Sequence, residues 1–385
     1  MKIPFDDEKL NTLMQEAGMD LVLATSKENV QYLLGGFRFF FFAHKDAIGA
    51  SRYLPVLGIP CKDFQKSFYI GNPGESWQRA AEPIWVQNVK NNQWFSDRAG
   101  KDAANFIRQL DLAKGTVAVE KCFIPADTLC ALQEEFPQTR FVDALPILEE
   151  LRAVKRPDEL VTINEATEQI IESMLTVMRS TKVGTTTREI AHRLHLEEIR
   201  RGLNFEYCLI TAGPNFNRAP SDARWEKGDI LSLDSGGNKD GYVGDLCRMA
   251  VMGEPTPLMR DLLAEVRAVQ AAARTGVKAG ILGGEIYEKA LAEQARCPHG
   301  DQMAFLAHGM GIIQHELPRL TNSGPIPYTA THANSPLDAG MVLSIETDLK
   351  NKEVGFVKLE DTVVVTKDGW EAYGDKGRDW VIVEE

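Results

Sequence analysis

Four acidic residues in the C-terminal half of the chain lie inside segments that are otherwise typical of buried strands. A lone carboxylate buried among apolar side chains is costly and would take up a proton. Each one alone is more often a surface or salt-bridged residue, but four together predict a fold that gathers them around a shared cation. They are Asp234 in ILSLDSGG, Asp245 in YVGDLCRM, Glu346 in MVLSIET and Glu360 in GFVKLEDTVVV.

The first two acids belong to consecutive strand patterns that a short turn connects. A two-residue loop at Lys239-Asp240 would place Asp234 directly opposite Asp245. Side chains at such paired positions share one face, with Cβ atoms ~4.5–5.5 Å apart. Asp240-Gly241 is itself a turn signal, and a loop there would shift this register.

Two histidines accompany the acids. His308 lies in AHGMG, where the glycines allow other backbone to approach closely, and His315 precedes Glu316-Leu317-Pro318. A single histidine is more often a core or surface group than a ligand. His308 becomes a candidate ligand because the four acids belong to the same part of the chain.

Composition restricts the partners. The chain has 385 residues and a formal net charge of −12, and it has no block of lysine or arginine. An acidic chain of this kind is a poor candidate for binding nucleic acid or an anionic membrane, whereas metal ions suit it. Apolar runs do not reach the ~18 residues of a membrane helix, and the acidic start MKIPFDDEKL is not typical of a secretory signal. Six scattered cysteines are typical of reduced thiols, so we expect a cytoplasmic protein.

The length predicts two domains, with a boundary in the charged segment LRAVKRPDEL, where Pro157 interrupts any continuous helix. We assign residues 1–155 to a smaller α/β domain that lacks a phosphate-binding glycine motif. We assign residues 156–385 to an α+β domain with a mostly antiparallel sheet. Strands are expected near 206–211, 229–235, 242–252, 304–315, 341–348 and 354–366, and the aromatic run Phe37–Phe42 is expected to be a strand in a core or a subunit interface.

These motifs together resemble the pita-bread metallopeptidases of family M24, which include methionine aminopeptidase, aminopeptidase P, prolidase and the creatinase-like proteins. The resemblance implies a pita-bread catalytic domain behind a creatinase-type N-terminal domain. It also implies two divalent metal ions per chain, with Mn first and Co, Fe or Zn as alternatives. The five ligands that it implies are Asp234, Asp245, His308, Glu346 and Glu360.

The resemblance further implies a metal-dependent hydrolase of the Xaa-Pro dipeptidase or aminopeptidase type. Asp245 and Glu360 would bridge the two ions, which activate a water for attack on an amide carbonyl. Glu346 would act as general base, and His315 would stabilise the tetrahedral intermediate. Family members of this kind are commonly homodimers.

The residues that would handle a peptide depart from the family pattern. Ser221 and Ala304 stand where proline-directed members carry histidines, and Lys358 replaces an arginine two residues before the last glutamate. Ser221, Tyr328 and Lys358 are our candidate substrate contacts, and Asp222 and Arg224 lie in a loop nearby. The departures keep two alternatives open: a metal-dependent hydrolase or lyase of a small non-peptide compound, and an inactive homologue used for binding.

Overall fold

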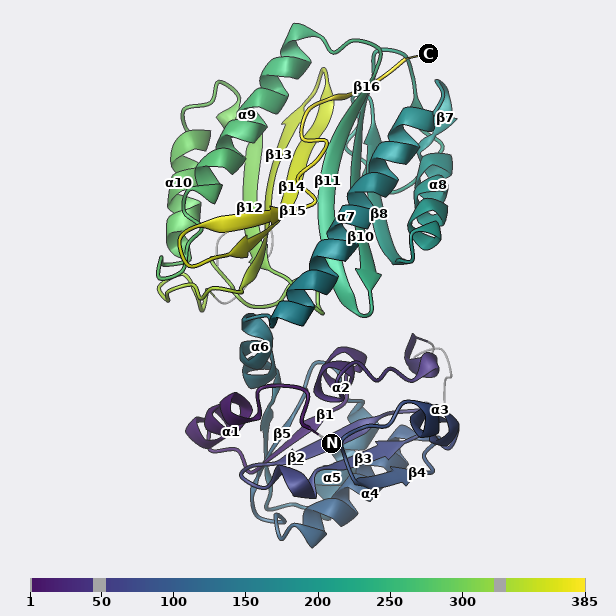
Figure 1. Cartoon of the computed structure of the whole chain (residues 1–385), viewed down its shortest axis with the longest axis vertical. Coiled ribbons are helices and arrows are strands. Elements are labelled where there is room, and N and C mark those ends of the chain that lie inside the picture. The colour runs from purple at the N-terminus through teal and green to yellow at the C-terminus, as the bar shows by residue number, and fades with distance from the viewer. Residues whose placement is uncertain (1, 44–52, 322–329, 385) are drawn as a thin grey trace. The chain divides into compact units, whose positions relative to one another are not determined.

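The computed structural model describes residues 2–43, 53–321 and 330–384, and the chain divides into two compact units, Met1–Leu151 and Arg152–Glu385. The first unit is a mixed six-stranded sheet with helices around it (Figure 1). Its strands, in sheet order, are β4 (Asn88–Asn91), β3 (Phe68–Gly71), β2 (Val56–Pro60), β1 (Leu21–Ala24), β5 (Thr116–Val119) and β6 (Arg140–Asp143). Its helices are α1 (Asp7–Glu16), α2 (Lys27–Leu33), α3 (Glu75–Ala81), α4 (Ser96–Gln109) and α5 (Ala126–Glu135), and α6 (Leu145–Ala153) runs into the second unit.

The aromatic run after α2 is not a strand, so that prediction is wrong. Phe40–Ala43 form a short 3₁₀ helix. Phe37 and Phe39 are buried, and the Phe39 ring packs edge-on against Tyr53 with centroids 5.6 Å apart. Phe40 and Phe41 are exposed, since a 3₁₀ turn does not alternate its side chains as a strand does.

The second unit is built on one large sheet that is almost entirely antiparallel. Six strands form the order β12-β13-β14-β11-β10-β8, β15 pairs with β14, and β16 runs parallel to β11. The strands are β8 (Asn204–Ala212), β10 (Ile230–Lys239), β11 (Tyr242–Met252), β12 (Met303–Gly309), β13 (Val342–Asn351), β14 (Gly355–Val365), β15 (Trp370–Tyr373) and β16 (Val381–Val383). The short strands β7 (Thr185–Thr186) and β9 (Arg224–Trp225) pair separately. The predicted α+β class, with an antiparallel catalytic domain and an α/β N-terminal domain, is confirmed.

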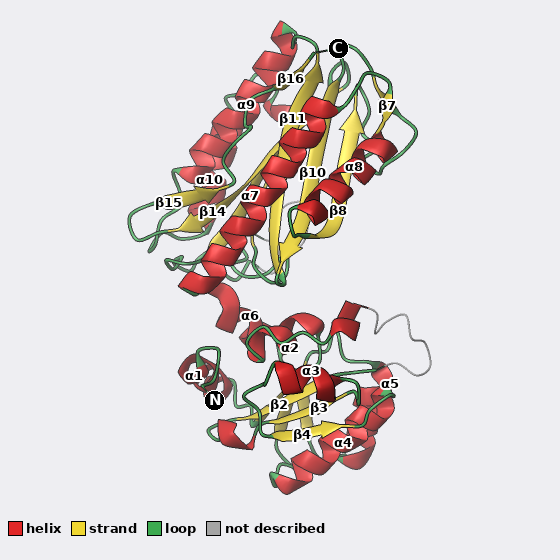
Figure 2. Ribbon diagram, turned by 45° about the vertical axis from the view of Figure 1, so that its right-hand side comes forward, coloured by secondary structure: helices red, strands yellow, loops and turns green. Residues whose placement is uncertain are grey.

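In the described part of this unit, four α-helices accompany the sheet: α7 (Pro157–Ser180), α8 (Thr187–Arg200), α9 (Pro257–Arg274) and α10 (Gly284–Gln294). Helix α7 starts with proline at its first position, and the Glu159 carboxylate accepts a hydrogen bond from the Arg156 amide at 2.8 Å. Helix α8 starts at a capping box in which Thr186 and Glu189 each accept from the other's amide. Figure 2 shows α7 and α9 lying across the sheet. Among the described residues, no helix has the length and hydropathy that crossing a membrane requires.

The alternation of side chains along β13 and β14 separates a helix-covered face from the opposite face. Ile345 and Leu359 belong to the core that includes residues of α9, and their carbonyls accept hydrogen bonds from Gln270 of that helix at 2.8 and 2.7 Å. Because successive side chains point to opposite faces, Glu346 and Glu360 point away from α9. The helices therefore leave the acidic side chains to the other face of the sheet.

Candidate metal centre

Three of the predicted ligands lie in one row across four neighbouring strands. Glu346 of β13 is directly opposite Glu360 of β14, Glu360 is opposite Cys247 of β11, and Cys247 is opposite Asp234 of β10. Directly paired residues share a face, so the three carboxylates and the Cys247 thiol all point to the same side. The register of the sheet thus brings together acids that are up to 126 residues apart in sequence.

Of the two registers that the sequence leaves open for the hairpin β10–β11, the structure has the one with the Asp240-Gly241 loop. Lys239 pairs with Tyr242, so the loop is Asp240-Gly241, and both loop residues have positive φ (51° and 93°). This is the turn that the right-handed twist of a hairpin favours. Asp245 is consequently opposite Gly236 rather than Asp234. Gly236 is two positions from Asp234 along β10, and two is an even number. Asp234 and Asp245 are therefore diagonal neighbours on the same face of the sheet.

The next row of the sheet supplies the histidine. His308 of β12 pairs with Ser344, two residues before Glu346, and therefore lies on the face of the acids. Three overlapping groups each have one ligand atom per residue within 4.8 Å of the others: Asp234/Asp245/Glu360, His308/Glu346/Glu360 and Asp245/His308/His315. The structure thus brings all five predicted ligands together, with His315 beside them.

The two ring nitrogens of His308 are arranged as in a metal-binding histidine. Its Nδ1 lies 3.2 Å from the carbonyl oxygen of Gly309, which identifies Nδ1 as the protonated nitrogen and leaves a lone pair on Nε2. Nε2 is buried, lies 3.9 Å from Oε1 of both Glu346 and Glu360, and has no hydrogen-bond partner within the described part of the chain. A buried acceptor that faces two carboxylate oxygens fits a shared cation. The oxygen-rich donor set with one imidazole suits Mn, Co, Fe or Zn.

The carboxylates themselves are held in an environment of low polarity. Burial raises the pKa of Asp245 well above its ordinary value, and the nearby charges of Glu360 and Asp234 raise it further. Burial also raises the pKa of Asp234, although the Lys358 ammonium acts in the opposite direction. Ionised acids in such a place need cations. A metal ion would release these protons and satisfy the same oxygens.

Side chains that the sequence analysis did not select complete the surroundings. The hydroxyl of Tyr207 on β8 donates to Asp245 Oδ1, and Gln314 donates to Asp245 Oδ2 at 2.6 Å. Arg218 donates to Asp234 Oδ2. The pair Gly236-Gly237 inside a strand is the signal that could have indicated Tyr207, because interior strand glycines mark a close approach. A Cβ at Gly236 would lie 2.2 Å from the Tyr207 ring, so the glycine is what lets tyrosine reach across to Asp245.

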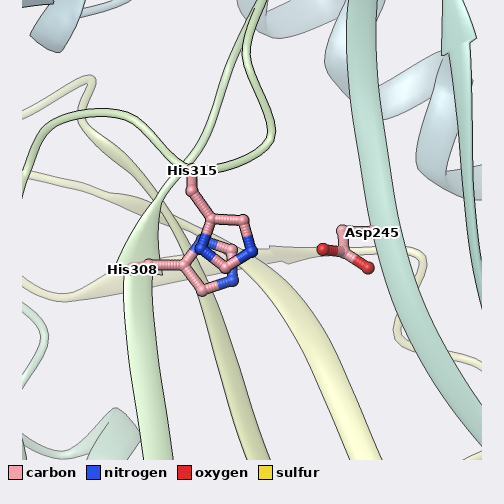
Figure 3. Close-up of side chains that lie close together, drawn as sticks. All are labelled: Asp245, His308 and His315. Atoms are coloured by element: carbon pink, nitrogen blue, oxygen red, sulfur yellow. The ribbon is translucent and has the colours of Figure 1, made fainter. Parts of the chain in front are cut away.

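His315 follows the end of β12, in a segment that is not a strand. The strand predicted for 304–315 ends at Gly309, and Glu316 donates its amide hydrogen back to the Gly309 carbonyl at 3.0 Å. This turn stacks the ring of His315 on that of His308, with centroids 3.8 Å apart (Figure 3). Burial, together with the positive charges nearby, lowers the pKa of His315 to about 3, so its imidazole is neutral at physiological pH.

The His315 turn is anchored by ion pairs. Glu316 accepts from Arg152 at 3.0 Å and pairs with Lys155 at 2.9 Å, and all three side chains are at most 2% exposed. Burial raises the pKa of Glu316, but the two cations more than compensate and hold it below its ordinary value. The predicted domain-boundary segment therefore supplies the cations that fix the turn next to the metal centre.

The candidate substrate contacts lie in different surroundings. Lys358 lies in the centre, where its ammonium contacts Asp234, Glu346 and Glu360. Ser221 is tied to the start of α8, with its amide donating to Thr187 Oγ1 at 2.9 Å. Tyr328 lies outside the described residues. Asp222 pairs with Arg188 at 3.3 Å on the surface, and Arg224 donates to the Gly184 carbonyl at 2.6 Å.

Comparison with known proteins identifies the family of the chain. Residues 161–367 match the model of metallopeptidase family M24, and residues 8–154 match the creatinase/prolidase N-terminal domain. The chain therefore belongs to metallopeptidase family M24, with a creatinase/prolidase N-terminal domain, as the resemblance predicts.

Individual relatives match along almost the whole chain. The chain is 24% identical to an Xaa-Pro dipeptidase of Lactobacillus delbrueckii subsp. lactis, with 95% of each chain covered. It is 26% identical to an Xaa-Pro dipeptidase of Pyrococcus horikoshii, with 94% of each covered. Among solved structures, an Xaa-Pro dipeptidase from Bacillus anthracis superposes with a TM-score of 0.81 at 20% identity, covering 98% of both chains. That last likeness supports the fold.

Proposed function

We propose that the chain is a metal-dependent hydrolase that cleaves Xaa-Pro dipeptides. The observation that carries the proposal is the gathering of four carboxylates and the lone pair of His308 on one face of the sheet, in a member of family M24. The Xaa-Pro dipeptidases that match over almost the full chain support the substrate class. We further propose two divalent ions, Mn²⁺ first, held by Asp234, Asp245, His308, Glu346 and Glu360.

The residues of the centre have separate tasks in this proposal. When bound, divalent ions polarise a carbonyl and lower the pKa of a water molecule. Glu346 is the most accessible of the four acids, with a 15% exposed side chain against 2% for Asp234 and Glu360, so it is placed to accept the water's proton. His315 is neutral and can donate its N–H to the oxyanion that develops at the scissile carbonyl.

The test is hydrolysis of Ala-Pro and of an Xaa-Pro-Xaa tripeptide with added Mn²⁺, before and after chelation. We expect cleavage that chelation abolishes and that Glu346→Gln lowers by at least ~10² in kcat. Glu353→Gln is the matched control, since Glu353 is exposed in the turn between β13 and β14. Cleavage of the dipeptide over the tripeptide supports a dipeptidase, and the reverse preference supports an aminopeptidase.

A second candidate function is the hydrolysis of a small non-peptide compound, or a lyase reaction on such a compound, at the same centre. Ser221 and Ala304, which replace histidines of proline-directed members, favour it. Ala304 lies four residues before His308 on β12, on the same face, and offers no donor there. Bound metal without cleavage of either peptide would favour this candidate, and a chain that binds no metal would favour the remaining alternative, an inactive homologue.

The oligomeric state and the cellular location of the protein are likewise proposals. We propose a homodimer in the cytoplasm with a small peptide as its substrate, with Ser221, Tyr328 and Lys358 as substrate contacts. Light scattering on the protein as it elutes from a size-exclusion column gives its mass directly. A mass near 86 kDa, twice the 42.8 kDa of one chain, is expected for a dimer.

A further inference from the structure

A further carboxylate lies on the face of the predicted metal ligands, and the proposed centre does not use it. Asp348 follows Glu346 by two residues on β13, so its side chain points to the same face of the sheet. Ala304 of β12 is directly opposite Asp348 on one side, and Lys358 of β14 is directly opposite on the other. Two residues along an antiparallel strand span ~6.8 Å, so these three residues, the Asp348 row, run beside the row of metal ligands.

Among the described residues, the Asp348 carboxylate has one weak ion-pair partner. Its Oδ1 is buried and takes part in no hydrogen bond with any residue that the structure describes. The Lys350 ammonium lies 3.9 Å from this oxygen, on a side chain that is 58% exposed. The Lys358 ammonium instead contacts three of the predicted metal ligands. A buried carboxylate oxygen without a donor is costly, so a cation on a bound substrate would stabilise it.

The neighbours of Asp348 leave the row accessible. The Asp348 side chain is 24% exposed, against 15% for Glu346, and Ala304 is half-buried. Alanine presents only a methyl group opposite the carboxylate, so a longer side chain from a substrate finds room there. Leu306, the next residue of β12 on this face, is directly opposite Glu346 and is apolar. Apolar atoms therefore lead from the row of metal ligands towards Asp348.

The spacing of the two rows selects the substrate group that Asp348 would hold. Only the α-carbon separates the α-ammonium of a dipeptide from its scissile carbonyl, which the proposed reaction places at the row of metal ligands. A lysine side chain carries its ammonium on a four-carbon stem, and the arginine side chain ends in a guanidinium. Such a stem can cross to the neighbouring row, with its methylenes against Leu306 and Ala304 and its charge at Asp348.

We propose that Asp348 is a specificity-determining residue, which selects substrates with lysine or arginine before the scissile bond. The proposal rests on the proposed Xaa-Pro dipeptidase function and adds the chemical class of the first residue. Two positions at which the chain departs from the family pattern, Ala304 and Lys358, flank Asp348 in its row. The first leaves space beside the carboxylate, and the second directs its charge to the metal ligands.

Steady-state kinetics of the full-length protein with Mn²⁺, on Lys-Pro and on norleucyl-Pro, test the proposal. Norleucine keeps the four carbons of the lysine side chain and lacks the ammonium. We expect kcat/KM for Lys-Pro to exceed that for norleucyl-Pro by about tenfold, between the effect of an exposed ion pair and that of a buried one. The preference should lie mainly in KM, because the ion pair forms on binding.

Variants of Asp348 assign the preference to its carboxylate. Asp348→Asn removes the charge and should bring the Lys-Pro to norleucyl-Pro ratio to within about twofold of one. Asp348→Glu keeps the charge and should retain a preference for Lys-Pro. Glu353→Gln is the matched control, because it removes the same charge from an exposed residue in the turn after β13, and its ratio should equal that of the wild type.

The outcomes separate this proposal from the proposed function. A wild-type ratio near one would overturn the proposal even if Asp348→Asn failed to fold. A ratio that Asp348→Asn leaves unchanged would overturn it as well, because the carboxylate would then hold the α-ammonium that both peptides share, or no substrate group. Both results would leave the proposed hydrolase intact. Cleavage of neither peptide by the wild type would overturn the proposed function together with this proposal.

Discussion

The ion cluster behind the His315 turn allows a quantitative prediction. Glu316→Gln removes a negative charge that both Arg152 and Lys155 contact, and the side chains of these two cations are 2% and 1% exposed. Taking one member out of a buried ion group costs about 3–5 kcal/mol, because the buried charges that remain lose a partner. Glutamine keeps one acceptor oxygen for Arg152, so we expect a loss near the lower end, about 3 kcal/mol.

A second ion pair of the same length provides the control. Glu254 pairs with Arg260 at 3.0 Å, the same distance as Glu316 to Arg152, but these side chains are 76% and 56% exposed. Exposed pairs contribute less than about 1 kcal/mol, so Glu254→Gln should change the stability little. The comparison separates the effect of burial from that of distance.

The assay must report on the catalytic unit alone, because a chain with two units need not unfold in one step. Hydrogen exchange of β13 and β14 peptides during urea unfolding gives the stability of that unit. Glu316→Gln should also lower kcat by roughly 10–100-fold, because a small displacement of His315 disturbs the reacting geometry. A Glu316→Gln protein that loses no more stability than Glu254→Gln would refute the reasoning.

Three further perturbations have defined outcomes. Burial raises the pKa of Glu198 to about 8, whereas the carboxyl group in the unfolded chain loses its proton near pH 4.5. Because the folded protein keeps this proton between the two pKa values, the free energy of unfolding falls as pH rises from 5 to 8. At roughly 1.4 kcal/mol per pH unit, the wild type should lose up to about 4 kcal/mol of stability over this range, and Glu198→Gln should not show this loss. Urea unfolding at several pH values would measure the difference. Gly236→Ala should push the Tyr207 ring away from Asp245, cost about 1–3 kcal/mol and weaken Mn²⁺ binding in a calorimetric titration. His315→Gln should lower kcat by ~10²–10³ with little change in KM, which steady-state kinetics would measure.

Each of these has a result that contradicts it. Parallel pH profiles for Glu198→Gln and the wild type would show that Glu198 is ionised in the folded protein. Unchanged Mn²⁺ affinity in Gly236→Ala would show that Tyr207 does not position Asp245. A His315→Gln protein with full kcat would remove His315 from the reaction.

The strand pattern indicated that the four acids share one face, because alternation survives errors of register, whereas the ligand set itself came from the resemblance and stays a prediction. The sequence left two loops open for the β10–β11 hairpin, and the two registers differ by two positions, so either one keeps Asp234 and Asp245 on the same face. The helices α7 and α8 were likewise predictable, since their starts depend on Pro157 and on the Thr186/Glu189 box.

The remaining parts of the site depend on contacts between segments that are distant in sequence, and only the Gly236-Gly237 pair gave a local sign of one of them. Tyr207 and Arg218 act across strand and loop boundaries, and each looks ordinary in its own segment. The strand expected through residue 315 ends at Gly309 because the backbone turns to bring Glu316 to Arg152 and Lys155. The position of the Lys358 ammonium needed the complete register of four strands.

Anomalous diffraction from crystals grown with Mn²⁺ tests the central claim most directly, because it locates the ion among named atoms. The account predicts a peak within about 2.3 Å of His308 Nε2, with Glu346 and Glu360 oxygens around it. Well-ordered crystals in millimolar Mn²⁺ without a peak there, with the glutamates bound to Lys358 alone, would contradict it.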